Sequence, residues 1–82
     1  MTTELELGAF YRETRERLGY TQRDVESAYC NHSLISRFEN GETVLRADKL
    51  LLAINGLDMT PTEFLYHMVI ISRIVYRFSI KK

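Results

Sequence analysis

The sequence is short of the features that mark secreted and membrane proteins. Its 82 residues contain one cysteine, one proline and no tryptophan. A single cysteine excludes an internal disulfide, so the chain is not a disulfide-stapled secreted scaffold, and we expect it in the reducing cytoplasm. The apolar stretch at residues 64–72, which contains no aspartate, glutamate, lysine or arginine, is far shorter than the ~20 apolar residues that span a bilayer. The acidic start also lacks the regions of a signal peptide, so we expect no membrane partner.

Neither sign of charge is in excess, since eleven lysines and arginines balance eleven aspartates and glutamates. A nucleic-acid-binding chain usually carries a basic excess, but binding depends on where the charges lie. Residues 1–40 hold five basic and seven acidic residues, whereas residues 41–82 hold six basic and four acidic ones. The neutral balance therefore does not exclude DNA binding. It predicts a weak electrostatic attraction of each protomer to DNA and a shallow dependence of DNA affinity on salt concentration.

Capping and stop signals divide the chain into short helices. Apolar residues make up 45% of the sequence and charged residues 27%, which is ordinary for one folded domain. Gly19, Gly41 and Gly56 are helix stops, and Asn31 is a candidate cap for the helix that begins at His32. The stretch 60–63, Thr-Pro-Thr-Glu, combines a capping box with proline at the first helical position. Apolar residues at helical spacing between these signals predict an all-α domain of five helices. We expect the helices at about residues 4–18, 21–28, 32–40, 46–55 and 61–76.

The C-terminal segment carries more apolar surface than so small a domain covers. Apolar residues recur there at the four-three spacing of a helical seam: Phe64, Met68, Ile71, Val75 and Phe78. Residues 74–80 also alternate between apolar and polar, as on a half-buried strand, so the last residues stay open between helix and strand. The surplus predicts a homodimer, or a domain cut from a larger protein. We assign residues 1–68 to the domain and residues 69–82 to an extension, with these dimer contacts: Met68, Ile71, Val75 and Phe78.

Two short helices about a brief turn, in residues 21–41, are typical of a helix-turn-helix. The stretch 18–22, Leu-Gly-Tyr-Thr-Gln, followed by Ser33-x-Ile-Ser-Arg-Phe-Glu-Asn-Gly41, resembles the XRE (Cro/CI-type) helix-turn-helix domain. The stretch from Cys30 to Glu39, with Thr-Pro-Thr-Glu-Phe-Leu at 60–65 behind it, most resembles the N-terminal domain of Rgg/MutR-type transcriptional regulators. The resemblance covers about residues 5–68 and implies a five-helix lambda-repressor-like fold.

That resemblance also implies roles for individual residues. Gln22 matches the glutamine that meets the DNA backbone and braces the recognition helix, which spans about residues 32–40. Arg15 and Glu39 match a partly buried ion pair between the first and third helices. The DNA-binding positions are expected to be Thr21, Gln22, His32, Ser33, Ser36, Arg37, Asn40, Thr43 and Arg46.

The chemistry of these residues supports the same roles. An arginine one turn into a recognition helix, such as Arg37, reaches guanine O6 and N7 in a bidentate contact that gives ~1–3 kcal/mol of discrimination. Exposed amides at the starts of the second helix and of the helix after Gly41 are suited to phosphates. Asn40, Thr43, Arg46 and Lys49 are candidate phosphate contacts. Serines near a helix start, such as Ser33 and Ser36, often only cap it, and His32 is equally well read as a surface residue.

Enzymatic and metal-binding readings have little support. Cys30 and His32 at two-residue spacing would give only two of the four ligands of a structural zinc site. A Cys/His nucleophile pair fails too, since His67 lies on an apolar stretch with no evident orienting group. We expect no enzyme activity, no metal and no cofactor.

Two function hypotheses remain. The first is a sequence-specific transcriptional regulator that binds double-stranded DNA as a homodimer, with half-sites about one helical turn (~34 Å) apart. The second is a protein-interaction module, antirepressor or antitoxin-like, on the same scaffold. Full-length Rgg/MutR-type proteins carry a C-terminal helical-repeat domain that binds signalling peptides. A peptide ligand is therefore expected only if a longer form of this chain has such a domain.

Overall fold

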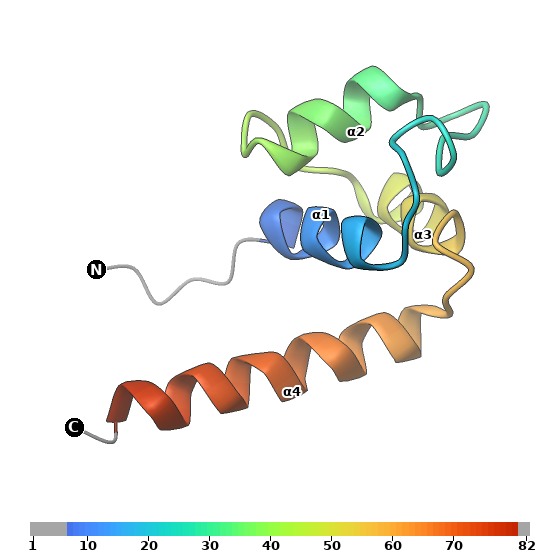
Figure 1. Ribbon diagram of the computed structural model, residues 1–82. Coiled ribbons are helices and arrows are strands. Elements are labelled where there is room, and N and C mark those ends of the chain that lie inside the picture. Colours follow the sequence, from blue (N-terminus) through green and yellow to red (C-terminus); the bar gives the residue numbers. More distant parts are fainter. Residues whose placement is uncertain (1–6, 81–82) are drawn as a thin grey trace.

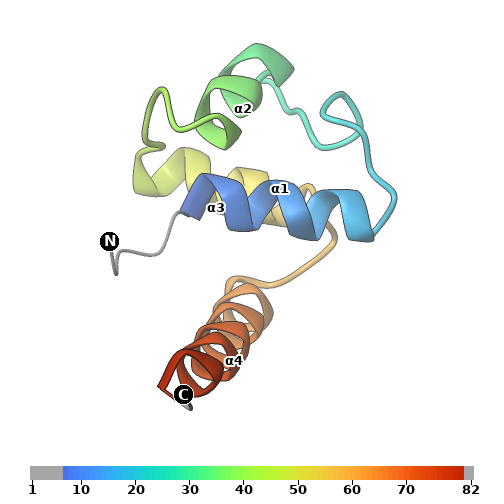
Figure 2. The same cartoon turned by 60° about the vertical axis from the view of Figure 1, so that its left-hand side comes forward.

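Four helices make up the fold (Figure 1). The structure, a computed structural model, describes the backbone of residues 7–80 and the side chains of residues 7–70. Within that part of the chain the helices are α1 (Leu7–Arg17), α2 (His32–Glu39), α3 (Ala47–Asn55) and α4 (Pro61–Ile80), and there is no strand. In Figure 1, α2 lies above α1 and α3, and α4 lies below them. Figure 2 views α4 nearly along its axis and shows it set apart from the other three.

Helix α1 ends as the glycine stop predicts. Gly19 has a φ of 84°, its N–H donates to the carbonyl of Glu16, and the N–H of Tyr20 donates to the carbonyl of Arg15. These two bonds form a Schellman motif, which satisfies carbonyls that the end of a helix leaves free. Residues 4–6 of the predicted first helix lie outside the described residues.

The predicted second helix, residues 21–28, does not form, and the five-helix count is wrong for the described chain. The N–H of Asp24 donates to the carbonyl of Thr21, and the N–H of Glu26 to that of Arg23, so the segment is a series of tight turns. It ends in an isolated antiparallel bridge between Ser27 and Cys30. The reason is that a helix this short is marginal without packing. Val25 is the segment's only fully buried side chain.

Helix α2 has the start and stop that the sequence predicts. The side chain of Asn31 accepts a hydrogen bond from the N–H of Leu34 over 2.9 Å, which is the geometry of an N-cap. At the other end Gly41 has a φ of 78°, a left-handed conformation that glycine adopts without strain. The N–H of Glu42 donates to the carbonyl of Arg37 over 2.9 Å, so a second Schellman motif ends the helix.

Helix α3 ends in a tighter turn than the sequence predicts. Gly56 is still right-handed helical, and the left-handed residue is Asp58, with a φ of 59°. The N–H of Leu57 bonds to the carbonyl of Ile54, so it does not reach back to that of Ala53. The hydroxyl of Tyr11 donates to the Ala53 carbonyl over 2.7 Å instead. A side chain of α1 thus caps the end of α3.

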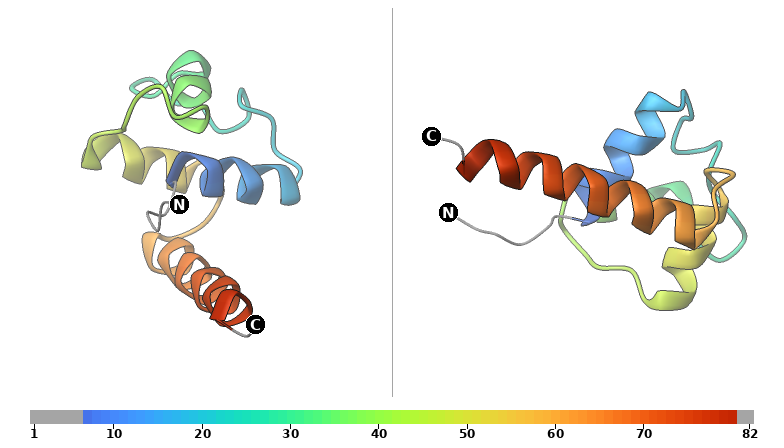
Figure 3. Two further views of the ribbon diagram at one scale, coloured as in Figure 1. Left: turned by 90° about the vertical axis from the view of Figure 1, so that its left-hand side faces the viewer. Right: turned by 90° about the horizontal axis from the view of Figure 1, so that it is seen from below.

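Helix α4 begins at the predicted capping box. The N–H of Glu63 donates to Oγ1 of Thr60 over 3.1 Å, and the Glu63 carboxylate accepts from the N–H of Thr60 over 2.9 Å. The helix continues to Ile80, past the expected end near residue 76, so the strand alternative for residues 74–80 is wrong. Seen from below in Figure 3, α4 crosses the underside of the other helices, and its C-terminal half runs past them. It passes residues 68 and 69 without a break, and the proposed division there stays a prediction.

All four helices contribute buried side chains to one core. The Phe10 and Phe64 rings lie edge to face at 5.1 Å, and Tyr11 lies within 5.9 Å of Phe38 and 6.1 Å of Phe64. Edge-to-face and tilted pairs at these distances are favourable beyond the area that they bury. The buried apolar residues are Phe10, Tyr11, Val25, Cys30, Ile35, Phe38, Ala53, Ile54, Leu57 and Phe64.

Candidate nucleic-acid interface

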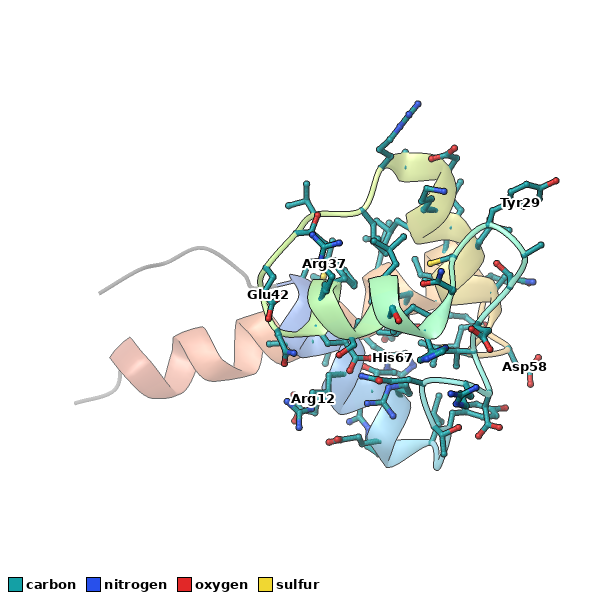
Figure 4. All side chains as sticks on the ribbon, turned by 90° about the horizontal axis from the view of Figure 1, so that it is seen from above. Arg12, Tyr29, Arg37, Glu42, Asp58 and His67 are labelled. Atoms are coloured by element: carbon teal, nitrogen blue, oxygen red, sulfur yellow. The ribbon has the colours of Figure 1, made fainter. Side chains whose placement is uncertain are left out.

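Helix α2 has an inner side in the core and an outer side in solvent. Ile35, Phe38 and Glu39 are buried, whereas Ser33 and Arg37, one turn apart, are exposed. Figure 4 views the molecule from the α2 side and shows Arg37 projecting between α2 and the loop that follows it. Arg37 makes no hydrogen bond or ion pair with any side chain that the structure describes. Its guanidinium is therefore available to a ligand.

An ion pair fixes the inner side of α2 to α1. Nε of Arg15 donates to Oε2 of Glu39 over 2.8 Å, and Nη2 donates to Oε1 over 3.0 Å, so the contact is bidentate. The two side chains are 8% and 1% exposed. The hydrogen bonds to Glu39 raise the pKa of Arg15, which therefore stays charged. Bidentate pairs fix orientation as well as distance, so this one sets how α2 lies on α1.

The same network includes the turns that precede α2. Nε2 of Gln22 donates to Oε1 of Glu39 over 3.0 Å, and Nη1 of Arg15 donates to the carbonyl of Tyr20 over 2.7 Å. Gln22 is half-buried, and its amide contacts α2 from the inner side of that helix. The structure thus brings together Arg15, Gln22 and Glu39, all three of which the sequence analysis singled out.

The backbones of α1 and α2 also touch directly. A Cβ on Gly8 would overlap the carbonyl oxygen of Phe38 and lie 3.2 Å from the Cα of Glu39. Only glycine allows the two helices to approach this closely. The close approach holds the C-terminal half of α2 against α1 at the level of the main chain.

A carboxylate that the sequence analysis missed lies at the N-terminus of α2. Oε2 of Glu26 accepts from the N–H of His32 over 2.8 Å and lies 3.0 Å from Nδ1 of the same residue. These hydrogen bonds from His32 lower the pKa of the Glu26 carboxyl. No sequence signal identifies the pair, because an isolated bridge and the turn that it encloses bring together residues six positions apart.

Thr21 lies in a reciprocal capping arrangement with Asp24. The N–H of Thr21 donates to the Asp24 carboxylate over 2.8 Å, and the N–H of Asp24 donates to Oγ1 of Thr21 over 3.1 Å. The expected free amide at the start of the second helix is therefore already bonded within the protein. The exposed side chain of Thr21 remains at the surface.

The loop after α2 and the start of α3 carry the expected phosphate contacts. Asn40 and Arg46 are exposed, and Thr43 is half-buried, with Oγ1 3.3 Å from the carbonyl of Val44. Arg46 occupies the N-cap position of α3 but makes no side-chain capping bond. Lys49 differs from them, as its ammonium donates to the carbonyl of Tyr29 over 2.7 Å and ties α3 to the turn before α2.

Two exposed apolar side chains flank the outer side of α2. Tyr29, 74% exposed, precedes the helix, and Val44, 86% exposed, follows it. Figure 4 shows Tyr29 projecting at the right-hand edge of the molecule and Arg37 beside α2. The sequence analysis assigned neither apolar residue to the interface, although apolar side chains contact thymine methyl groups in the major groove.

The apolar seam of α4 is only partly available to a partner. Phe64 is 1% exposed and belongs to the domain core, and Met68 packs against that core. The side chains of Ile71, Val75 and Phe78 lie outside the described residues. The exposed apolar residues are instead on another side of α4, which we call the outer α4 patch: Leu65, Tyr66, Val69 and Ile70.

Comparison with protein families identifies the class of domain. The family described as the helix-turn-helix domain matches residues 6–65, which is more than half of the chain. The chain belongs to this family of DNA-binding domains, which are typically not enzymes. Comparison with the curated proteins and with the solved structures finds no match.

The described residues provide no basis for a metal site or a membrane segment. Among them no three histidine, cysteine, aspartate or glutamate side chains gather as metal ligands would. None of the described helices combines the length and apolar character needed to cross a membrane.

Proposed function

We propose that this protein is a sequence-specific DNA-binding transcriptional regulator that acts in the cytoplasm as a homodimer. The observation that carries the proposal is an exposed arginine on a helix whose opposite side is fixed by a buried ion pair. Arg37 is exposed and has no partner among the described side chains, whereas Glu39, two residues on, is bound by Arg15 and Gln22. The short motifs around these residues favour the XRE class and, within it, the Rgg/MutR type.

In this proposal α2 enters the major groove with its N-terminal and outward residues toward the bases. Arg37 donates to guanine O6 and N7, and His32 and Ser33 lie on the same helix toward its start. Ser36 is half-buried beside them. Asn40, Thr43 and Arg46 hold phosphates on one strand, while Thr21 and Gln22 meet the other side of the groove. Such contacts position the helix, and the outward side chains read the sequence.

A dimer is proposed because one protomer has few cations to hold a phosphate backbone. Lys49 is engaged by the Tyr29 carbonyl, and Glu42 and Asp48 lie near Arg46 in the sequence. Two recognition helices about one helical turn (~34 Å) apart double the contacts. Helix α4, with Met68, Ile71, Val75 and Phe78, is the proposed dimer element.

The test is selection from a randomised duplex library at two salt concentrations, with mass measured by light scattering. We expect a two-fold symmetric site and a dimer. Arg37→Ala should reduce binding to the selected site by about five- to 150-fold per half-site, since a bidentate pair gives ~1–3 kcal/mol. Arg12→Ala is the matched control, because Arg12 is an exposed arginine on α1 whose one ion-pair partner among the described residues is Glu16. No retention of wild-type protein on any duplex near physiological salt contradicts the proposal.

A second candidate function is a protein-interaction module. The outer α4 patch favours it, because four exposed apolar residues lie together on one side of a helix. A module of this kind should lose binding to its partner on Val69→Asp and keep that binding on Arg37→Ala. A DNA-binding protein should instead lose specific DNA binding on Arg37→Ala while keeping its fold.

A further inference from the structure

Glu26 and His32 form a contact that capping alone does not explain. One carboxylate oxygen, Oε2 of Glu26, lies 2.8 Å from the backbone nitrogen and 3.0 Å from Nδ1 of His32. The helix already has an N-cap in Asn31, whose side chain accepts from the N–H of Leu34. The His32 side chain is 36% exposed and that of Glu26 32%, so the ring is held by the carboxylate yet still reaches solvent.

The chemistry of the pair decides which ring nitrogen carries a proton. An ionised carboxylate only accepts hydrogen bonds, and the bonds from His32 lower the pKa of the Glu26 carboxyl, which keeps it ionised. Nδ1 therefore has to be the N–H that donates to Oε2. In the neutral ring the other nitrogen, Nε2, is then a hydrogen-bond acceptor, and it points away from Glu26.

We infer that Glu26 is a positioning residue that fixes His32 in the Nδ1–H form and thereby sets which base His32 reads. The inference rests on the proposed DNA-binding function and names a specificity determinant within it. A neutral His32 offers an acceptor to the exocyclic amino group of adenine or cytosine. A protonated His32 keeps its bond to Glu26 and offers Nε2–H, a donor suited to guanine O6 or N7.

The charged surroundings of the pair are simple within the described residues. Among the described residues, Glu26 is the only acidic side chain within ion-pair distance of His32. The positive charge of Arg23, in the same turn segment, also lowers the pKa of the Glu26 carboxyl. Helix α2 itself contributes Arg37, which lies more than one turn further on. Glu26 is therefore the group that sets the state of the ring.

The first experiment uses free protein and needs no DNA. Nitrogen chemical shifts of the imidazole rings distinguish the two neutral forms, and His67, the second of the two histidines, is an internal reference on α4. We expect His32 in the Nδ1–H form at pH 8. Glu26→Gln, which is isosteric and also has a donor, should give a mixture of both forms. A His32 ring that is mainly Nε2–H in the wild type, or unchanged in Glu26→Gln, overturns the inference.

The second experiment compares base preference on selected duplexes. At pH 8 the wild type should prefer adenine or cytosine at the position that His32 contacts, by about two- to tenfold for a single hydrogen bond. Glu26→Gln should lose the preference at pH 8, and in a His32→Ala background it should have no further effect. Asn31→Ala is the matched control, because it removes the other cap of α2: overall affinity should fall without a change in preference.

The outcomes separate the two proposals. If the wild type selects no site at all, the DNA-binding function fails, whatever the ring nitrogens show. If the wild type selects a site and Glu26→Gln reads every position as the wild type does, the assignment of Glu26 is wrong and the proposed function stands. If Asn31→Ala changes base preference as much as Glu26→Gln does, Glu26 acts only as a helix cap, which also overturns the inference.

Discussion

Replacing Glu39 by alanine should destabilise the whole domain as well as weaken DNA binding. In the native chain the Glu39 side chain is 1% exposed and accepts two hydrogen bonds from Arg15 and one from Gln22. Glu39→Ala leaves the Arg15 guanidinium, 8% exposed, without its carboxylate. Removal of one partner is far worse than removal of both, because a buried charge then loses its bidentate partner and keeps only the exposed Glu16 carboxylate, 3.8 Å from its Nη2.

The expected loss is large relative to the total stability of so small a protein. Breaking a buried pair from one side costs about 3–5 kcal/mol. A domain of 82 residues has a free energy of unfolding of roughly 4–12 kcal/mol at ~0.05–0.15 kcal/mol per residue. At about 4–8 °C per kcal/mol, the melting temperature should fall by at least about 12 °C. Glu39→Gln keeps the volume and one acceptor, so the melting temperature of this variant should fall by less.

The assay is thermal and urea unfolding followed by circular dichroism, together with binding to the selected duplex. The double variant Arg15→Met/Glu39→Leu is the control: it removes both charges and should be more stable than Glu39→Ala alone. A melting temperature of Glu39→Ala within about 5 °C of the wild type would refute the reasoning, as would a double variant less stable than the single one.

Three further predictions follow from contacts of α1 and of the turn before α2. Gly8→Ala should destabilise by about 1–3 kcal/mol in urea unfolding, because the new methyl group meets the Phe38 carbonyl; a gain in stability would show that the helices can separate. Tyr11→Phe should cost about 1–2 kcal/mol by the same measurement, since it leaves the Ala53 carbonyl unbonded, and an unchanged midpoint contradicts this. Hydrogen bonds within its turn lower the pKa of the Asp24 carboxyl. Ionised Asp24 therefore stabilises the fold at pH values above the ordinary carboxyl pKa of about 3.8, and this stabilisation is lost as the pH falls below that value. The stability difference between wild type and Asp24→Asn should therefore shrink below pH 4, and a difference that persists to pH 2 contradicts the assignment.

Helix ends were predictable from the sequence, because their causes are local. The stop at Gly41, the cap at Asn31 and the box at Thr60 each involve residues within a few positions of one another. The same local reasoning fails at residues 21–28. Thr21 and Asp24 have the side chains of a helix start, and they do make the reciprocal bonds, but what they close is a turn. Whether a helix continues from such a start depends on apolar residues to bury, and this segment buries little beyond Val25.

Contacts across the chain were predictable only where a family pattern carried them. The resemblance pointed to Arg15 and Glu39, which are 24 positions apart and touch in the structure. Nothing comparable pointed to Glu26 beside His32, because their approach depends on turns that helical periodicity does not describe. The spacing of apolar residues in α4 likewise predicted a single apolar side. In the structure the helix has two apolar sides, an inner one with buried Phe64 and an outer one with exposed Leu65. Periodicity shows that a residue is apolar, but the neighbouring elements decide which apolar side is already covered.

The two sides of α2 have a consequence for how such a domain changes over generations. Everything described that fixes its C-terminal half, from the Gly8 approach to the Glu39 ion pair, lies on its inner side. Ser33 and Arg37 share none of those contacts. Exchanging these outward side chains should therefore leave folding intact, so a duplicated copy could acquire a new target by a few substitutions and without compensating changes in its core.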